Sequence, residues 1–196
     1  MFCTKIYHMF GGNMDKDRRL ELIEGFIKAN AEKYKAMEIR NKCVDNKINI
    51  GSTNLVDSDL QRVENYVDAA NKEFLEQDYR FNSFIRTLDI PRLNTFSSLI
   101  KKYSNQRELE IEEYRKYIDP LHENSWEGYK AKEEVAYFEK YERLSIKNLL
   151  YMIARRKGEK FGMNDEYARK YATCEIDKLI DIDILFDELP KTKKRD

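Results

Sequence analysis

Glycine and proline are scarce in this chain of 196 residues, which contains only 7 and 3 of them. Average usage would give roughly 14 and 10. All-β domains need these residues in their many turns, so the scarcity disfavours an all-β fold. Cysteine is also sparse, because Cys3, Cys43 and Cys174 are far apart and odd in number. This excludes a disulfide framework and a paired-cysteine metal site. Such a small and odd number of separated cysteines is typical of a reducing compartment, either the cytoplasm or a particle assembled inside a cell.

Histidine, phosphate-binding motifs, net charge and long apolar runs are lacking too. His8 and His122 are the two histidines, and no Glu-x-x-His pattern occurs, so we expect no metal site. No glycine-rich phosphate loop is present, so no cofactor is expected. Lysine plus arginine and aspartate plus glutamate both number 36, which removes any general attraction to nucleic acids or membranes. No segment approaches the roughly 18 apolar residues of a membrane span, so we expect no membrane contact.

What the chain does have is apolar residues at steps of three and four. Aromatic residues make up 12% of the sequence, which excludes plain disorder. The spacing predicts an all-α protein, a bundle of five or six helices that forms a single domain over residues 14–189, with a sub-boundary near 119–125. The predicted helices cover residues 15–43, 55–89, 91–118, 125–143, 146–153 and 164–179, with Ser125, Ser145 and Asn164 as N-caps.

Other segments are less regular. Residues 1–13 have no period and are expected to be loosely attached, and residues 190–196 form a basic tail. Residues 47–50 alternate as in a short extended piece, residues 104–106 can break the third helix, and residues 155–162 read as a loop. Residues 180–189 fit either a strand or a continued helix, and we favour the helix.

The helix predicted over 55–89 carries a heptad seam, as in a coiled coil. Its apolar residues step by four and three in turn, and they are Val56, Leu60, Val63, Val67, Ala70 and Phe74. At about 30 residues the helix would be about 45 Å long. A compact domain of this size spans only about 30 Å. We therefore expect this helix to project or to pack against another chain, and the seam predicts self-association.

Basic residues cluster near Gly158 and Gly162, and they are Arg155, Arg156, Lys157 and Lys160. Residues 140–160 contain seven basic and two acidic side chains, whereas residues 165–188 contain three basic and eight acidic ones. One hypothesis is a basic helix and loop that meets the phosphates of a nucleic acid. The alternative, which we favour, is that the basic and acidic helices lie antiparallel and neutralise each other.

One pattern of residues is associated with catalysis. Arg115 and His122 are separated by six residues at the end of a predicted helix. This resembles the R-x(4–6)-H signature of HEPN-type ribonucleases. The resemblance implies that Arg115 orients a phosphate and that His122 is the general acid or base acting on the ribose 2′-hydroxyl. The alternative, which we favour, is a surface histidine that follows a turn at Pro120.

Tyrosines concentrate in the second half of the chain, where they suit half-buried helix seams and protein interfaces. They are Tyr103, Tyr114, Tyr117, Tyr129, Tyr137, Tyr141, Tyr151, Tyr167 and Tyr171. We predict a non-enzymatic helical interaction or assembly subunit that acts in an oligomer or larger complex. The alternatives are a nucleic-acid-binding accessory factor and, third, a HEPN-like ribonuclease. The Lys, Asn, Ile, Tyr and Glu content suits an AT-rich genome, such as that of a phage or mobile element.

Overall fold

The computed structural model describes residues 14–116, 118 and 125–187, except for residues 51–56. It confirms the all-α fold. Over this part of the chain the elements are α1 (Met14–Ile50), α2 (Asp57–Thr87), α3 (Ile90–Arg115), α4 (Trp126–Tyr137), the π-helical turn η3 (Phe138–Glu142), α5 (Arg143–Lys160) and α6 (Asp165–Asp187). The segments 1–13, 119–124 and 190–196, for which we predicted a loose start, a sub-boundary and a basic tail, lie outside the described residues.

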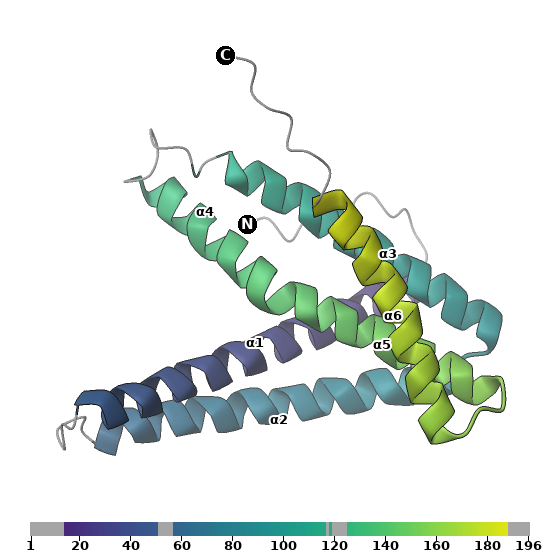
Figure 1. Ribbon diagram of the computed structural model, residues 1–196, viewed down its shortest axis with the longest axis horizontal. Coiled ribbons are helices and arrows are strands. Elements are labelled where there is room, and N and C mark those ends of the chain that lie inside the picture. The colour runs from purple at the N-terminus through teal and green to yellow at the C-terminus, as the bar shows by residue number, and fades with distance from the viewer. Residues whose placement is uncertain (1–13, 51–56, 117, 119–124, 188–196) are drawn as a thin grey trace, which may run out of the picture.

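The first two helices form a long antiparallel hairpin, which projects from the other helices (Figure 1). α1 has 37 residues. It is therefore about 55 Å long at 1.5 Å per residue. The predictions that this helix ends near Cys43 and that residues 47–50 are extended are both wrong. Pairing with α2 continues along the projecting arm, where Arg40 Nε donates a 2.8 Å hydrogen bond to Glu64.

The middle of the heptad seam lies between these two helices. Val67 and Ala70 of α2 are buried with Ala36 of α1 in one small apolar cluster. Phe74 continues the seam towards the main core, and its ring meets that of Phe26 edge to face, with centroids 5.8 Å apart. The seam from Val67 to Phe74 therefore has α1 of the same chain as a partner, and Val56 lies outside the described residues.

α4, η3 and α5 make one continuous helical rod from Trp126 to Lys160. Ser125 caps its start, because its hydroxyl accepts a 3.0 Å hydrogen bond from the backbone N–H of Gly128. The predicted new start at Ser145 is wrong. The Ser145 hydroxyl donates a 2.8 Å hydrogen bond to the carbonyl of Tyr141 and accepts one of 3.2 Å from Asn30 Nδ2. Ser145 therefore ties the middle of the rod to α1.

The hydrophobic core lies where α1, α2, α3 and the rod cross. Its centre is a row of buried phenyl rings, with centroids 5.3 Å apart for Phe26 and Phe81 and 5.8 Å apart for Phe81 and Phe96. Buried aliphatic side chains from the same helices surround the row, namely Ile23, Ile27, Ile85, Leu93, Ile100, Ile111, Ile146, Leu149 and Ile153. These contacts join residues far apart in sequence into one core.

Other boundaries follow local signals. Asp89 caps α3, as its side chain accepts a 2.9 Å hydrogen bond from the N–H of Arg92, and Pro91 lies in the first turn. α3 runs unbroken through residues 104–106, so the predicted break is wrong. α6 continues to Asp187, which confirms the helical reading of residues 180–187. None of the helices in the described part of the chain is long and apolar enough to cross a membrane.

Candidate interaction surface

A tight turn joins α5 to α6 at one end of the molecule. Gly162 has a φ of +82°, the left-handed conformation that favours glycine. The N–H of Met163 donates to the carbonyl of Gly158 at 3.1 Å, which closes the end of α5. A Cβ atom on Gly158 would lie 3.1 Å from the Cα of Ala168. The missing side chain therefore lets α6 fold back tightly against α5.

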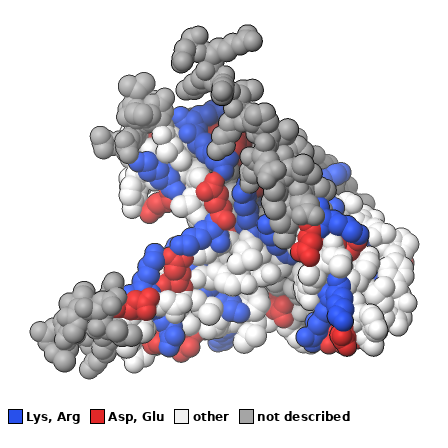
Figure 2. Space-filling view, viewed as in Figure 1, with Lys and Arg blue, Asp and Glu red and all other residues white. Residues whose placement is uncertain are grey.

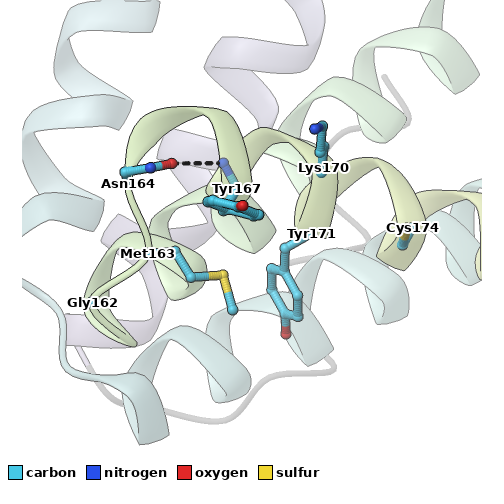
Figure 3. Close-up of a pocket in the computed structure, with 7 residues that line it drawn as sticks. All are labelled: Gly162, Met163, Asn164, Tyr167, Lys170, Tyr171 and Cys174. Atoms are coloured by element: carbon cyan, nitrogen blue, oxygen red, sulfur yellow. Dashed lines mark hydrogen bonds between the residues drawn. The ribbon is translucent and has the colours of Figure 1, made fainter.

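A shallow, open pocket lies on this turn and on the first turns of α6 (Figure 3). Its lining residues are Gly162, Met163, Asn164, Tyr167, Lys170, Tyr171 and Cys174. Asn164 caps α6, because its Oδ1 accepts a 3.0 Å hydrogen bond from the N–H of Tyr167. The Tyr167 ring lies over the turn, and the Met163 side chain points towards Tyr171 (Figure 3). The pocket wall is therefore mostly apolar and aromatic.

Two large rings beside the pocket are open to solvent. Phe161 is 55% exposed and Tyr167 is 61% exposed. The Phe161 ring meets Tyr171 edge to face at 6.3 Å, and partial burial raises the pKa of the Tyr171 hydroxyl. Figure 2 shows an uncharged area at this end of the molecule, with blue and red side chains beside it. Exposed aromatic groups gathered at one place are typical of protein-binding surfaces.

Charged side chains of both signs surround the pocket. Asp165 pairs with Arg169 and with Arg155, each at 2.7 Å, and the Arg169 hydrogen bond is the main cause of the lowered pKa of Asp165. Glu166 pairs with Lys170 at 2.7 Å, one turn further along α6. The Lys170 ammonium also lies 5.7 Å from the centre of the Tyr167 ring. The pocket thus has an apolar centre and a rim of alternating charge.

The basic residues singled out from the sequence lie on the last turns of α5, so the predicted loop over 155–162 is wrong for residues 155–160. Arg155 pairs with Asp165 across the turn, and Arg156 pairs with Glu159 at 2.6 Å. Burial lowers the pKa of Lys157, while Lys160 is exposed. Both arginines are therefore engaged with carboxylates, which leaves less positive charge for a phosphate backbone.

Only the arginine of the ribonuclease-like pattern lies in the described part of the chain. Arg115 forms ion pairs with Glu112 of α3 and Glu139 of η3. His122 lies outside the described residues. No group of three or more His, Cys, Asp or Glu side chains that could hold a metal ion occurs among the described residues. Cys43 and Cys174, the cysteines that the structure describes, are free thiols.

Of the tip formed by Phe161, Met163 and Tyr167, only Tyr167 was among the tyrosines that the sequence associated with protein interfaces. The sequence signal that could have found it is an apolar group between Gly158 and Asp165, where a solvated turn would be polar. No family model, curated protein or solved structure matches this chain.

Proposed function

We propose that this protein is a non-enzymatic assembly subunit that self-associates through the start of α6. The observation that carries the proposal is the exposed aromatic cluster of Phe161 and Tyr167 around the shallow pocket at the α5–α6 turn. Leaving such rings in water costs free energy that contact with a protein surface would recover. In the part of the chain that the structure describes, no metal-binding cluster accompanies this pocket.

The charges on α6 favour a second copy of the same chain as the partner. Glu166 and Lys170 are one helical turn apart, on the same side of α6 as Tyr167. When the exposed faces of two α6 helices lie antiparallel, with a twofold axis crossing them at the level of residue 168, each Glu166 faces Lys170 of the second copy. A twofold contact must be self-complementary, and this arrangement of opposite charges around an aromatic centre meets that condition.

The heptad seam is a weaker choice for this contact. Val67 and Ala70 are already buried against α1, so a second chain would have to displace that helix. The exposed apolar side chains on α2, Leu75 and Tyr79, lie outside the seam and are 64% and 73% exposed. They offer a matched control, because they form an equally open apolar pair on a different helix.

Sedimentation velocity over a range of concentrations tests the proposal. We expect the wild type to form a dimer at micromolar concentrations and the double variant Phe161→Ser/Tyr167→Ser to stay monomeric. The control variant Leu75→Ser/Tyr79→Ser should dimerise like the wild type. A wild type that stays monomeric at several hundred micromolar would refute self-association. Loss of the dimer in Leu60→Glu, with the Phe161/Tyr167 variant unaffected, would instead place the contact on the heptad seam.

A further inference from the structure

A second surface lies between the α1–α2 hairpin and α4, where the molecule is hollowed (Figure 2). At the closed end of this hollow the two walls are tied together by hydrogen bonds. Tyr66 of α2 and Tyr137 of α4 both donate to the Glu32 carboxylate of α1, the latter at 3.2 Å. Tyr141 donates to Glu38 at 2.8 Å. From this junction the hairpin and α4 diverge (Figure 1).

One wall of the hollow is an aromatic face of α4. Its buried residues Gly128, Ala131 and Val135 all lie on the side that packs against α3. Trp126, Glu133 and Tyr137 fall on the opposite side at helical spacing, so they share the face that contacts α1 through Tyr137. Trp126 is 73% exposed and Tyr129 is 55% exposed, and their rings stack on each other at 6.3 Å. This face presents two large rings to solvent.

The other wall is the polar side of α1. Lys35 lies over the Tyr137 ring at 5.5 Å, and Lys42 follows two turns later with 68% of its side chain exposed. Lys140 extends from η3 towards the same wall, where it pairs with Glu38. Blue and red side chains lie on both sides of the hollow in Figure 2. The carboxylate of Glu38 is already shared between Lys140, Lys42 and Tyr141. With Glu32 at the closed end, the wall has three lysines against two carboxylates and so a small excess of positive charge.

We infer that this hollow binds an amphipathic α-helix of a partner protein, with its apolar side on Trp126 and Tyr129 and its acidic side on Lys35 and Lys42. α4 has 12 residues and is about 18 Å long, which matches three turns of a docked helix. Apolar anchors at helical spacing lying in a groove are a common mode of peptide recognition. A second copy of the same surface does not fit, because a concave surface cannot face itself across a twofold axis. The inference is independent of the proposed α6 contact.

The fluorescence of Trp126 reports directly on this surface, because the chain has only 1 tryptophan. The probe is a synthetic peptide of about 14 residues without tryptophan, with leucines at three- and four-residue steps and glutamates on the other side. We expect a saturable blue shift of Trp126 emission when this peptide is added to the full-length protein. A matched peptide with lysine in place of glutamate should bind at least about tenfold more weakly, because its charges repel Lys35 and Lys42.

Variants locate the binding. Tyr129→Ser and Lys35→Glu/Lys42→Glu should each weaken binding of the acidic peptide about tenfold. Lys72→Glu, on an exposed position of α2, should have no effect. Circular dichroism confirms that each variant is folded. The α6 variants described above should bind the peptide normally, so failure of one proposal leaves the other intact.

Four results would overturn the inference. No shift with either peptide would mean that the hollow binds no such helix, and equal binding of both peptides would remove the role of charge. If the wild type does not bind the acidic peptide but the full-length variant Phe2→Ser/Phe10→Ser does, the hollow would be assigned to the chain's own N-terminal segment. Trp126 emission that changes with protein concentration alone would assign it to a second copy.

Discussion

Arg107 of α3 and Glu142 of the π turn form an ion pair whose side chains are mostly buried, with 15% and 13% exposed. Nε and Nη2 of Arg107 both lie 3.1 Å from Oε2 of Glu142. Arg107 also donates to Glu110 at 2.7 Å, and its guanidinium lies 5.9 Å from the centre of the Phe138 ring. This contact fixes α3 against the continuous rod at the position of the π turn.

Replacing Arg107 with methionine should destabilise the fold strongly, because it leaves the Glu142 charge buried without its partner. We expect the free energy of unfolding to fall by about 3 kcal/mol, measured by urea denaturation. The matched control is Lys116→Met, whose pair with Glu113 is exposed at 65% and 68%. That change should cost under about 1 kcal/mol. Equal effects of the two substitutions would show that the Arg107 contact is not a structural tie.

Replacing Glu24 with glutamine should stabilise the protein at neutral pH. Burial raises the pKa of Glu24 above 4.5, and the charges of Glu21 and Glu110 add to the effect. The folded state therefore binds a proton more readily than the unfolded state, so this group adds stability as the pH falls from neutral towards 4.5. The thermal midpoint of Glu24→Gln should exceed that of the wild type at pH 7, with the difference shrinking near pH 4.5. A thermal midpoint of Glu24→Gln below that of the wild type at pH 7 would contradict this prediction. Glu76→Gln, at an exposed position of α2, serves as the control.

Glu38 should show the opposite pH dependence. Hydrogen bonds from Lys140, Lys42 and Tyr141 lower the pKa of Glu38 from 4.5 to about 2. The folded state therefore holds the charged form, and the stabilisation is complete above pH 4.5 and is lost as the pH falls towards 2. Glu38→Gln should melt below the wild type at pH 7, and the two midpoints should converge between pH 4.5 and pH 2. A difference that stays constant with pH would exclude an ionic role for Glu38.

Replacing Gly158 with valine should separate α6 from α5. Even a Cβ would lie 3.1 Å from the Cα of Ala168 and 3.3 Å from Sδ of Met163, so a branched side chain does not fit. We expect a loss of about 2 kcal/mol in unfolding free energy, and loss of self-association as the pocket opens. The control Ala136→Val, at an exposed position of α4, should change stability by about 0.5 kcal/mol or less. If Gly158→Val keeps both stability and dimer, the close approach of the two helices is unimportant.

Local signals predicted much of the fold. The heptad spacing in α2 and the caps at Ser125 and Asn164 all act within a few residues, so they can be recognised in a single sequence. The π turn gave no such signal, because Tyr137 to Glu142 fit an ordinary helix. Its tertiary contacts, including Arg107 with Glu142, join residues 35 positions apart. Long-range pairs of this kind depend on the fold and were not predictable.

The candidate site was harder to predict than the fold. Gly158 indicated a loop, whereas in the structure it is a helical residue that allows α6 to approach. The basic cluster was recognised, but the pairing of Arg155 with Asp165 depends on how α6 folds back. Phe161 and Tyr167 have no distinctive spacing, and only the turn between them brings their rings to one end of the molecule.

The measurement that tests self-association most directly is sedimentation velocity on two charge variants, alone and mixed. Glu166→Lys places two positive charges on the proposed α6 contact, and Lys170→Glu places two negative charges there. Each variant alone should be monomeric where the wild type dimerises, and the equimolar mixture should form a heterodimer because each Lys then faces a Glu. A mixture that sediments as monomers, while the wild type dimerises at the same concentration, would contradict the proposed contact.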